Sequence, residues 1–83
     1  MNAAAYLENV KKALGITGEQ MDGTLTVYID EVLAFCVDAG VPAAKITDGL
    51  VARGVTDLWD YGSGNGSLSD YFKMRVSQLA LGR

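Results

Sequence analysis

Few residues of this chain have side chains that could carry out chemistry. The sequence contains no histidine, the commonest general base and a frequent zinc ligand. Its single cysteine, Cys36, lies at helical spacing from Ile29 and Val32, so we expect a buried, inert thiol. Asp57 and Asp60 could form a carboxylate pair, but no third ligand type accompanies them, and a solvated helix face is the favoured interpretation. These residues predict neither an enzyme nor a metal or cofactor site.

The segment at residues 62–67, Gly-Ser-Gly-Asn-Gly-Ser, is the remaining candidate for ligand binding. A dinucleotide-binding loop follows a strand and has a third glycine where Ser67 stands, whereas here a helix is predicted before the loop. No Gly-Lys-Ser/Thr sequence follows, so the segment is not a P-loop either. We therefore interpret it as a flexible glycine-rich connector between two helices.

Apolar residues at helical spacing predict a helix before the connector; they are Val51, Val55, Leu58 and Trp59. Thr47 or Asp48 would cap its N-terminus, and Gly62 would end it because glycine readily adopts the left-handed conformation. Gly54 lies inside this helix, where glycine costs up to about 1 kcal/mol relative to alanine. We expect Gly54 to allow the close approach of a neighbouring helix or subunit.

The other helices follow from similar signals. A last helix is predicted over about 70–81, with Ser69 as its N-cap and Asp70 in its first turn. A first helix is predicted over about 3–14, with Gly15 as its stop. A second helix would begin after Asp22, with the Asp22 carboxylate as its cap, and run to about residue 39.

The second helix has a wide apolar stripe, typical of a central helix in a small bundle: Leu25, Tyr28, Ile29, Val32, Phe35, Cys36 and Ala39. Residues 41–47 form a linker with one helical turn, and no strand alternation is present. The sequence thus predicts one all-α domain over residues 1–83, a bundle of about four helices with the glycine-rich loop before the last one.

Charge and hydrophobicity narrow the class of protein. Seven basic and ten acidic residues give a net charge of −3, the wrong sign for a protein that neutralises phosphates. Glu8 and Lys12 are expected to form a weak ion pair on a solvated helix face, and Arg53 and Asp57 a weaker one because of their order. The longest apolar run, residues 32–37, is far shorter than the roughly 20 residues of a membrane span. The N-terminus does not read as a secretory signal, and the single cysteine fits synthesis in a reducing cytoplasm.

The order of motifs in the second half resembles the small head-tail connector, or head-completion adaptor, proteins of tailed bacteriophages. That family carries the motif A-R-G-x-x-D-L-W-x-Y-G-S-G and then a Y-F-x-x-R-V helix, which match residues 52–64 and 71–76 here. Residues 14–16 and 38–42 resemble the family's first helix end and second helix exit. The resemblance therefore covers nearly the whole chain.

The resemblance implies a structural adaptor, not an enzyme, that needs no cofactor and assembles as a homo-oligomeric ring beneath the portal after DNA packaging. The ring would extend the DNA channel, and its partners would be the portal protein and neighbouring connector or tail proteins. DNA would pass without specific binding, and the protein would be made in the host cytoplasm and reside at the head-tail interface of the virion, with no membrane contact. We predict that its interfaces involve the motif residues Arg53, Gly54, Asp57, Trp59, Tyr61, Tyr71 and Arg75.

Two interpretations remain open. Trp59 either closes the core beneath the loop, or one residue of the pair Trp59 and Tyr61 anchors a protein interface. The alternative function is that of a small helical DNA-binding or regulatory protein. The loop is longer than the tight turn of a helix-turn-helix, however, and only Lys73 and Arg75 are basic in the last helix.

Overall fold

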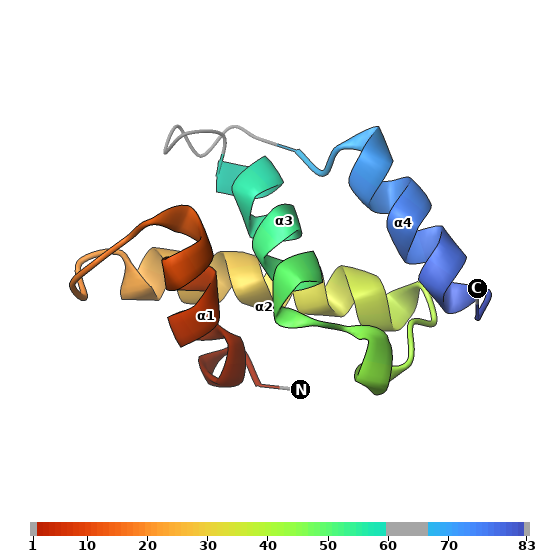
Figure 1. Ribbon diagram of the computed structural model, residues 1–83, viewed down its shortest axis with the longest axis horizontal. Helices are drawn as coiled ribbons and strands as arrows, with labels where there is room; N and C mark the ends of the chain where they lie inside the picture. The colour runs from red at the N-terminus through yellow and green to blue at the C-terminus, as the bar shows by residue number, and fades with distance from the viewer. Residues whose placement is uncertain (1, 60–66, 83) are drawn as a thin grey trace.

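The computed structural model describes residues 2–59 and 67–82, and in this part of the chain it contains helices and no strand (Figure 1). The elements are α1 (Ala4–Leu14), α2 (Asp22–Asp38), the short 3-10 helix η1 (Ala43–Lys45), α3 (Asp48–Trp59) and α4 (Asp70–Ala80). The predicted all-α bundle of four helices and the helical turn in the linker are confirmed. Residues 62–66 of the predicted connector, including the predicted helix stop at Gly62, lie outside the described residues.

Helix α2 lies along the length of the molecule, and α1, α3 and α4 cross one side of it (Figure 1). The backbones of α1, α2 and α3 pack closely, whereas α4 lies further out and reaches the bundle through its side chains. The largest completely buried side chains come from all four helices: Val10, Leu25, Ile29, Val32, Val51, Val55, Phe72 and Val76. The predicted role of α2 as a core helix is therefore confirmed, although Ala39, at its end, is exposed and Leu33, outside the predicted stripe, is buried.

Local signals set three of the helix ends as predicted. Gly15 ends α1 in the left-handed conformation, with a φ of 72°. The Thr47 hydroxyl accepts a hydrogen bond from the Leu50 amide at 3.2 Å and thereby caps α3. The Ser69 hydroxyl accepts one from the Phe72 amide at 3.1 Å and caps α4.

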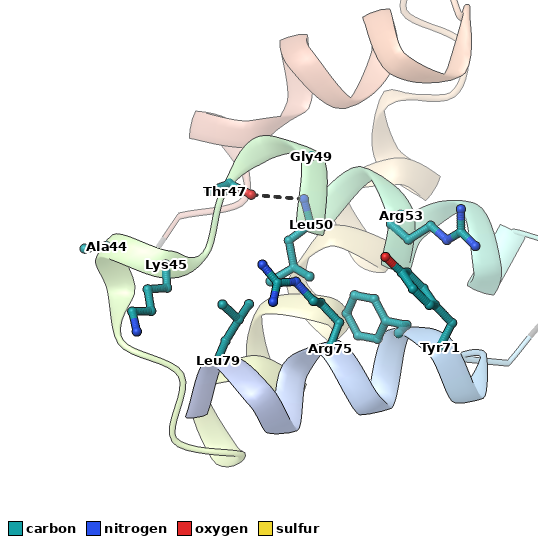
Figure 2. A pocket seen from close by; sticks show the side chains of 10 residues that line it. Ala44, Lys45, Thr47, Gly49, Leu50, Arg53, Tyr71, Arg75 and Leu79 are labelled. Atoms are coloured by element: carbon teal, nitrogen blue, oxygen red, sulfur yellow. Dashed lines mark hydrogen bonds between the residues drawn. The ribbon is translucent and has the colours of Figure 1, made fainter. Parts of the chain in front are cut away.

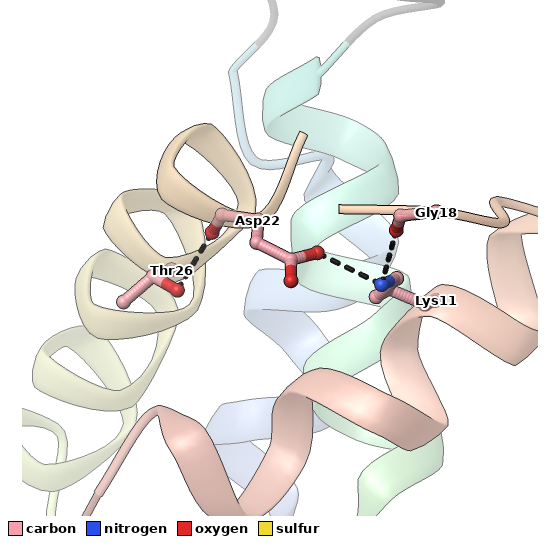
Figure 3. Close-up of polar contacts among 4 residues, drawn as sticks. All are labelled: Lys11, Gly18, Asp22 and Thr26. Atoms are coloured by element: carbon pink, nitrogen blue, oxygen red, sulfur yellow. Dashed lines mark hydrogen bonds and ion pairs between the residues drawn. The ribbon is translucent and has the colours of Figure 1, made fainter. Parts of the chain in front are cut away.

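The predicted capping role of Asp22 is wrong. Asp22 is already the first residue of α2, Met21 is the N-cap residue, and no side chain caps this end. The Asp22 carboxylate instead forms an ion pair with Lys11 Nζ at 2.8 Å, and Lys11 also donates to the Gly18 carbonyl oxygen (Figure 3). The hydrogen bond with Asp22 raises the pKa of Lys11 above its ordinary 10.5. This contact fastens the loop between α1 and α2, so the carboxylate serves tertiary structure rather than the helix end.

The other ion pairs predicted from helical spacing do not form. Lys11 with Asp22 is the ion pair found among the described residues, so Glu8 is not paired with Lys12, nor Arg53 with Asp57. Spacing within one helix only weakly determines whether an ion pair forms, since exposed pairs of this kind contribute only about 0.3–0.5 kcal/mol to stability.

Cys36 is completely buried, as predicted, and burial raises the pKa of its thiol above the ordinary 9.0. We expect the native protein to react with thiol reagents at neutral pH far more slowly than the urea-unfolded protein. Because burial favours the neutral thiol, the stability that it contributes is complete below the ordinary pKa of 9.0 and is lost as the pH rises through the folded-state pKa. Cys36→Ala is expected to cost of order 1 kcal/mol and to lack this part of the alkaline decline. Rapid labelling of the folded protein would contradict the expectation.

None of the helices in the described part of the chain is long and apolar enough to cross a membrane.

Candidate interaction site

A groove of about 570 Å³ opens between α4 and the segment that comprises η1 and the start of α3 (Figure 2). Leu50 and Leu79 supply apolar surface to it, the completely buried Phe72 borders it from the core, and Tyr71 stands on its α4 side. Three cationic side chains complete the lining: Lys45, Arg53 and Arg75. We call this surface the basic groove.

The basic groove concentrates positive charge in an acidic chain. Three of the six lysines and arginines that the structure describes line the groove, whereas no acidic side chain of the described residues lines it. Asp48 lies between two lining residues in sequence, but its carboxylate turns to α1, where it accepts a hydrogen bond from Asn9 Nδ2 at 2.6 Å. The groove is therefore suited to an acidic partner that also has apolar surface.

Arg53 and Tyr71 form a contact between the two walls of the groove. The Arg53 guanidinium carbon lies 5.1 Å from the centroid of the Tyr71 ring, within the range of a cation–π interaction (Figure 2). Both side chains are exposed. Arg75, further along α4, donates from Nη1 to Gln78 Oε1 at 3.3 Å. Both arginines have neutral partners, so their positive charge remains available to a ligand.

Asp57 has a different role, because it ties the end of α3 to the start of α4. Its Oδ2 atom accepts hydrogen bonds from the Ser69 hydroxyl at 2.8 Å and from the Ser69 amide at 3.2 Å. The same hydroxyl accepts a hydrogen bond from the Phe72 amide, so the three residues form a hydrogen-bond chain that orders the N-terminus of α4. The carboxylate is thus used within the chain, and its possible partner Asp60 lies outside the described residues.

Asp57→Ala is expected to lower the free energy of unfolding by about 1 to 2 kcal/mol, because it leaves two half-buried donors of Ser69 without an acceptor. Urea denaturation followed by circular dichroism measures this loss. Thr56→Ala is the matched control, since among the described residues the Thr56 hydroxyl bonds only the Ala52 carbonyl of its own helix, and its cost should stay within about 0.5 kcal/mol. Ser69→Ala should cost less in the Asp57→Ala background than in the wild type, because the Ser69 hydroxyl then loses only its bond from the Phe72 amide. Additive losses would show that the two residues act independently.

The structure therefore places the predicted interface residues in different surroundings. Arg53, Tyr71 and Arg75 meet at the basic groove. Gly54 is buried, and a Cβ atom there would lie 2.8 Å from Val32 Cγ2, so its close approach is to a helix of the same chain. Trp59 is half-buried and packs against the core, as the core-closing interpretation expects. Tyr61 lies outside the described part of the chain, and its interface role stays a prediction.

Sequence reasoning missed Lys45, Leu50 and Leu79 as parts of this surface. Lys45 belongs to η1, far along the chain from α4, and no local pattern connects the two segments. Leu50 and Leu79 could have been noticed as apolar residues at the edges of the stripes of α3 and α4. Within residues 2–59 and 67–82, no three His, Cys, Asp or Glu side chains are grouped to hold a metal ion.

The comparison with known families agrees with the arrangement of motifs and helices. The family model described as phage gp6-like head-tail connector protein matches residues 4–81, a span that includes all four helices and the whole basic groove. No curated protein and no solved structure matches the chain. Because the family match extends over nearly the full length, the chain belongs to the phage gp6-like head-tail connector protein family.

Proposed function

We propose that this connector assembles as a ring beneath the portal of a phage head, where it extends the DNA channel and joins the head to the tail. The family match over residues 4–81 carries the proposal, because it makes the chain a structural connector of the virion that contacts other head and tail proteins. The role is structural rather than catalytic. The portal protein, other copies of this chain and the next connector or tail protein are its proposed partners.

The physical properties of the chain support an assembled state. A chain of 83 residues buries only about 60–65% of the surface that its unfolded form exposes, so subunit contacts would add considerably to its stability. Five large apolar side chains of the described residues are exposed, more than half of each being accessible. A net charge of −3 favours a conduit through which DNA passes without sticking.

The test of this function uses phage particles. Mass spectrometry should detect the chain in mature virions, and electron microscopy with averaging should place a ring of it directly beneath the portal. Deletion of its gene should leave DNA-filled heads without tails, and the gene supplied in trans should restore infectivity. Virions that lack the chain, or complete particles formed without it, would contradict the proposal.

The DNA-binding alternative predicts specific binding to duplex DNA, which the connector function does not. At roughly 150 mM salt we expect no specific binding to duplex DNA, because the net charge is negative and the basic groove offers only three cations. Electrophoretic mobility shift assays over a salt series measure this binding. A submicromolar, salt-sensitive shift that depends on DNA sequence would favour the regulatory function.

A further inference from the structure

Helix α2 has an acidic face that no other helix covers. The exposed residues of this helix recur at helical spacing, opposite the buried side that contacts α1 and α3. We call six of these exposed residues the acidic face: Val27, Asp30, Glu31, Ala34, Val37 and Asp38. Helix α2 contains no lysine or arginine, and its other acidic residue, Asp22, is paired with Lys11. Within the described part of the chain, the three carboxylates of the acidic face form no ion pair.

The acidic face and the basic groove lie on different sides of the molecule. Helix α2 is behind α3 and α4 in Figure 1, and it remains behind the groove in Figure 2. Its buried side is turned to the bundle, so the acidic face points away from the bundle. A single subunit can therefore present both surfaces to separate neighbours.

Exposed apolar side chains accompany both surfaces. Val27 and Val37, which are 63% and 54% exposed, belong to the acidic face. Tyr71 and Met74, which are 58% and 55% exposed, belong to α4, and Tyr71 lines the basic groove. Leu81, directly after α4, is the remaining exposed large apolar residue of the described chain. Apolar area combined with charge of one sign is what a specific protein contact needs, and here the two signs are opposite.

We infer that the acidic face of one subunit docks against the basic groove of the next copy of this chain. The inference rests on the proposed ring and names the surfaces that would form it. Two copies of the acidic face would repel each other, as would two copies of the basic groove, so a symmetric pair is disfavoured. A contact between two different surfaces repeats head to tail, and such contacts close into rings.

The size of the subunit allows this arrangement. Helix α2 has 17 residues and so is about 25 Å long, comparable with the middle dimension of the molecule, 24 Å. The accessible surface is 4984 Å², so two faces of about 800 Å² each, the usual share per partner, would take about a third of it. Duplex DNA is a poorer occupant, since it has no apolar side chains to cover and the chain as a whole repels it.

Charge reversal tests the inference in particles assembled from plasmid-supplied subunits. D30R/E31R reverses the acidic face and R53E/R75E reverses the basic groove. Each variant alone is expected to reduce the amount of the chain in purified particles at least about tenfold. In the combined chain D30R/E31R/R53E/R75E the charges of the two surfaces are exchanged, so attraction between them is restored. Its incorporation is expected to recover to within about threefold of the wild type.

Two controls separate the contact from general charge effects. Glu8→Arg and Lys12→Glu change exposed residues of α1, outside both surfaces, and should leave incorporation unchanged. Circular dichroism melting should show that all the variants fold, because every substituted residue is exposed. Failure of the combined chain to recover, while each half-variant folds, would overturn the inference. Duplex DNA binding that R53E/R75E abolishes would assign the groove to phosphate and would overturn it as well.

Cysteine cross-linking gives a second, geometric readout in the same particles. Ala34→Cys places a thiol on the acidic face and Met74→Cys places one beside the basic groove, while native Cys36 is buried. After oxidation, the chain with both substitutions should give a ladder of multimers on a non-reducing gel, and each single variant should stay monomeric. Dimers of the Ala34→Cys chain, or no ladder from particles that contain the chain, would overturn the inference and leave the proposed ring intact. Absence of the wild-type chain from particles would instead refute the proposed function.

Discussion

Phe72→Ala is expected to lower the free energy of unfolding by about 3 to 5 kcal/mol. The Phe72 side chain is completely buried, and its ring centroid lies 6.0 Å from that of Phe35 on α2. Helix α4 makes few close backbone contacts with the bundle, so Phe72, Val76 and Leu79 attach it. Loss of the largest of these side chains leaves a cavity and weakens the attachment of the whole helix.

Urea denaturation followed by circular dichroism measures this loss. A domain of this size has a total stability of about 4 to 12 kcal/mol, at about 0.05–0.15 kcal/mol per residue, so Phe72→Ala removes most of it only at the lower end of that range. Phe72→Leu keeps most of the buried volume and should retain a measurable transition, at a cost of about 1 to 2 kcal/mol. Tyr71→Ala changes the exposed neighbour and should cost less than about 0.5 kcal/mol. Equal losses for Phe72→Ala and Tyr71→Ala would show that α4 is not anchored by Phe72.

Gly54→Ala is expected to lower the free energy of unfolding by about 2 to 3 kcal/mol, although alanine favours helix formation by up to about 1 kcal/mol over glycine. A Cβ atom at Gly54 would lie 2.8 and 2.9 Å from the two γ-methyl groups of Val32 and 3.0 Å from Phe72 Cε1. Both neighbours are completely buried, and the branched valine side chain has little freedom to move. The helices must therefore separate to admit one methyl group.

The same α3 helix supplies the control for this prediction. A Cβ atom at Gly49 would have no neighbouring atom within 4 Å, so Gly49→Ala should leave stability unchanged or raise it by up to about 1 kcal/mol. Val32→Ala removes the two crowding methyl groups, and in that background Gly54→Ala should cost about 1 kcal/mol or less. Thermal and urea melts of Gly49→Ala, Gly54→Ala, Val32→Ala and the double variant at Gly54 and Val32 measure these changes. Additive losses at Gly54 and Val32 would contradict the close contact between α2 and α3.

Much of the secondary structure was predictable because its signals are local. Gly15 ends α1, Thr47 caps α3 and Ser69 caps α4, and each acts on backbone groups within a few residues of itself. Periodic apolar residues likewise identify the buried side of each helix, since the helical repeat is a property of the backbone. The order of motifs, moreover, was enough to indicate the connector family.

The partners of the polar side chains were not predictable in this way. Asp22 pairs with Lys11 instead of capping α2, and Asp57 bonds Ser69 across the connector instead of pairing with Arg53. A place at a helix start suggested a cap for Asp22, and helical spacing suggested a partner for Asp57, but the packed helices brought a more distant group within reach of each.

The sequence by itself determined the number of helices, their approximate ends and the buried thiol, because these follow from propensity, capping and hydrophobic period. Only the tertiary structure decided that Gly54 serves the core and that Arg53, Tyr71 and Arg75 meet Lys45 around one groove. The reason is that a surface assembled from separate segments depends on how helices pack against one another. Packing is set by the fit of many side chains at once, which no single local pattern records.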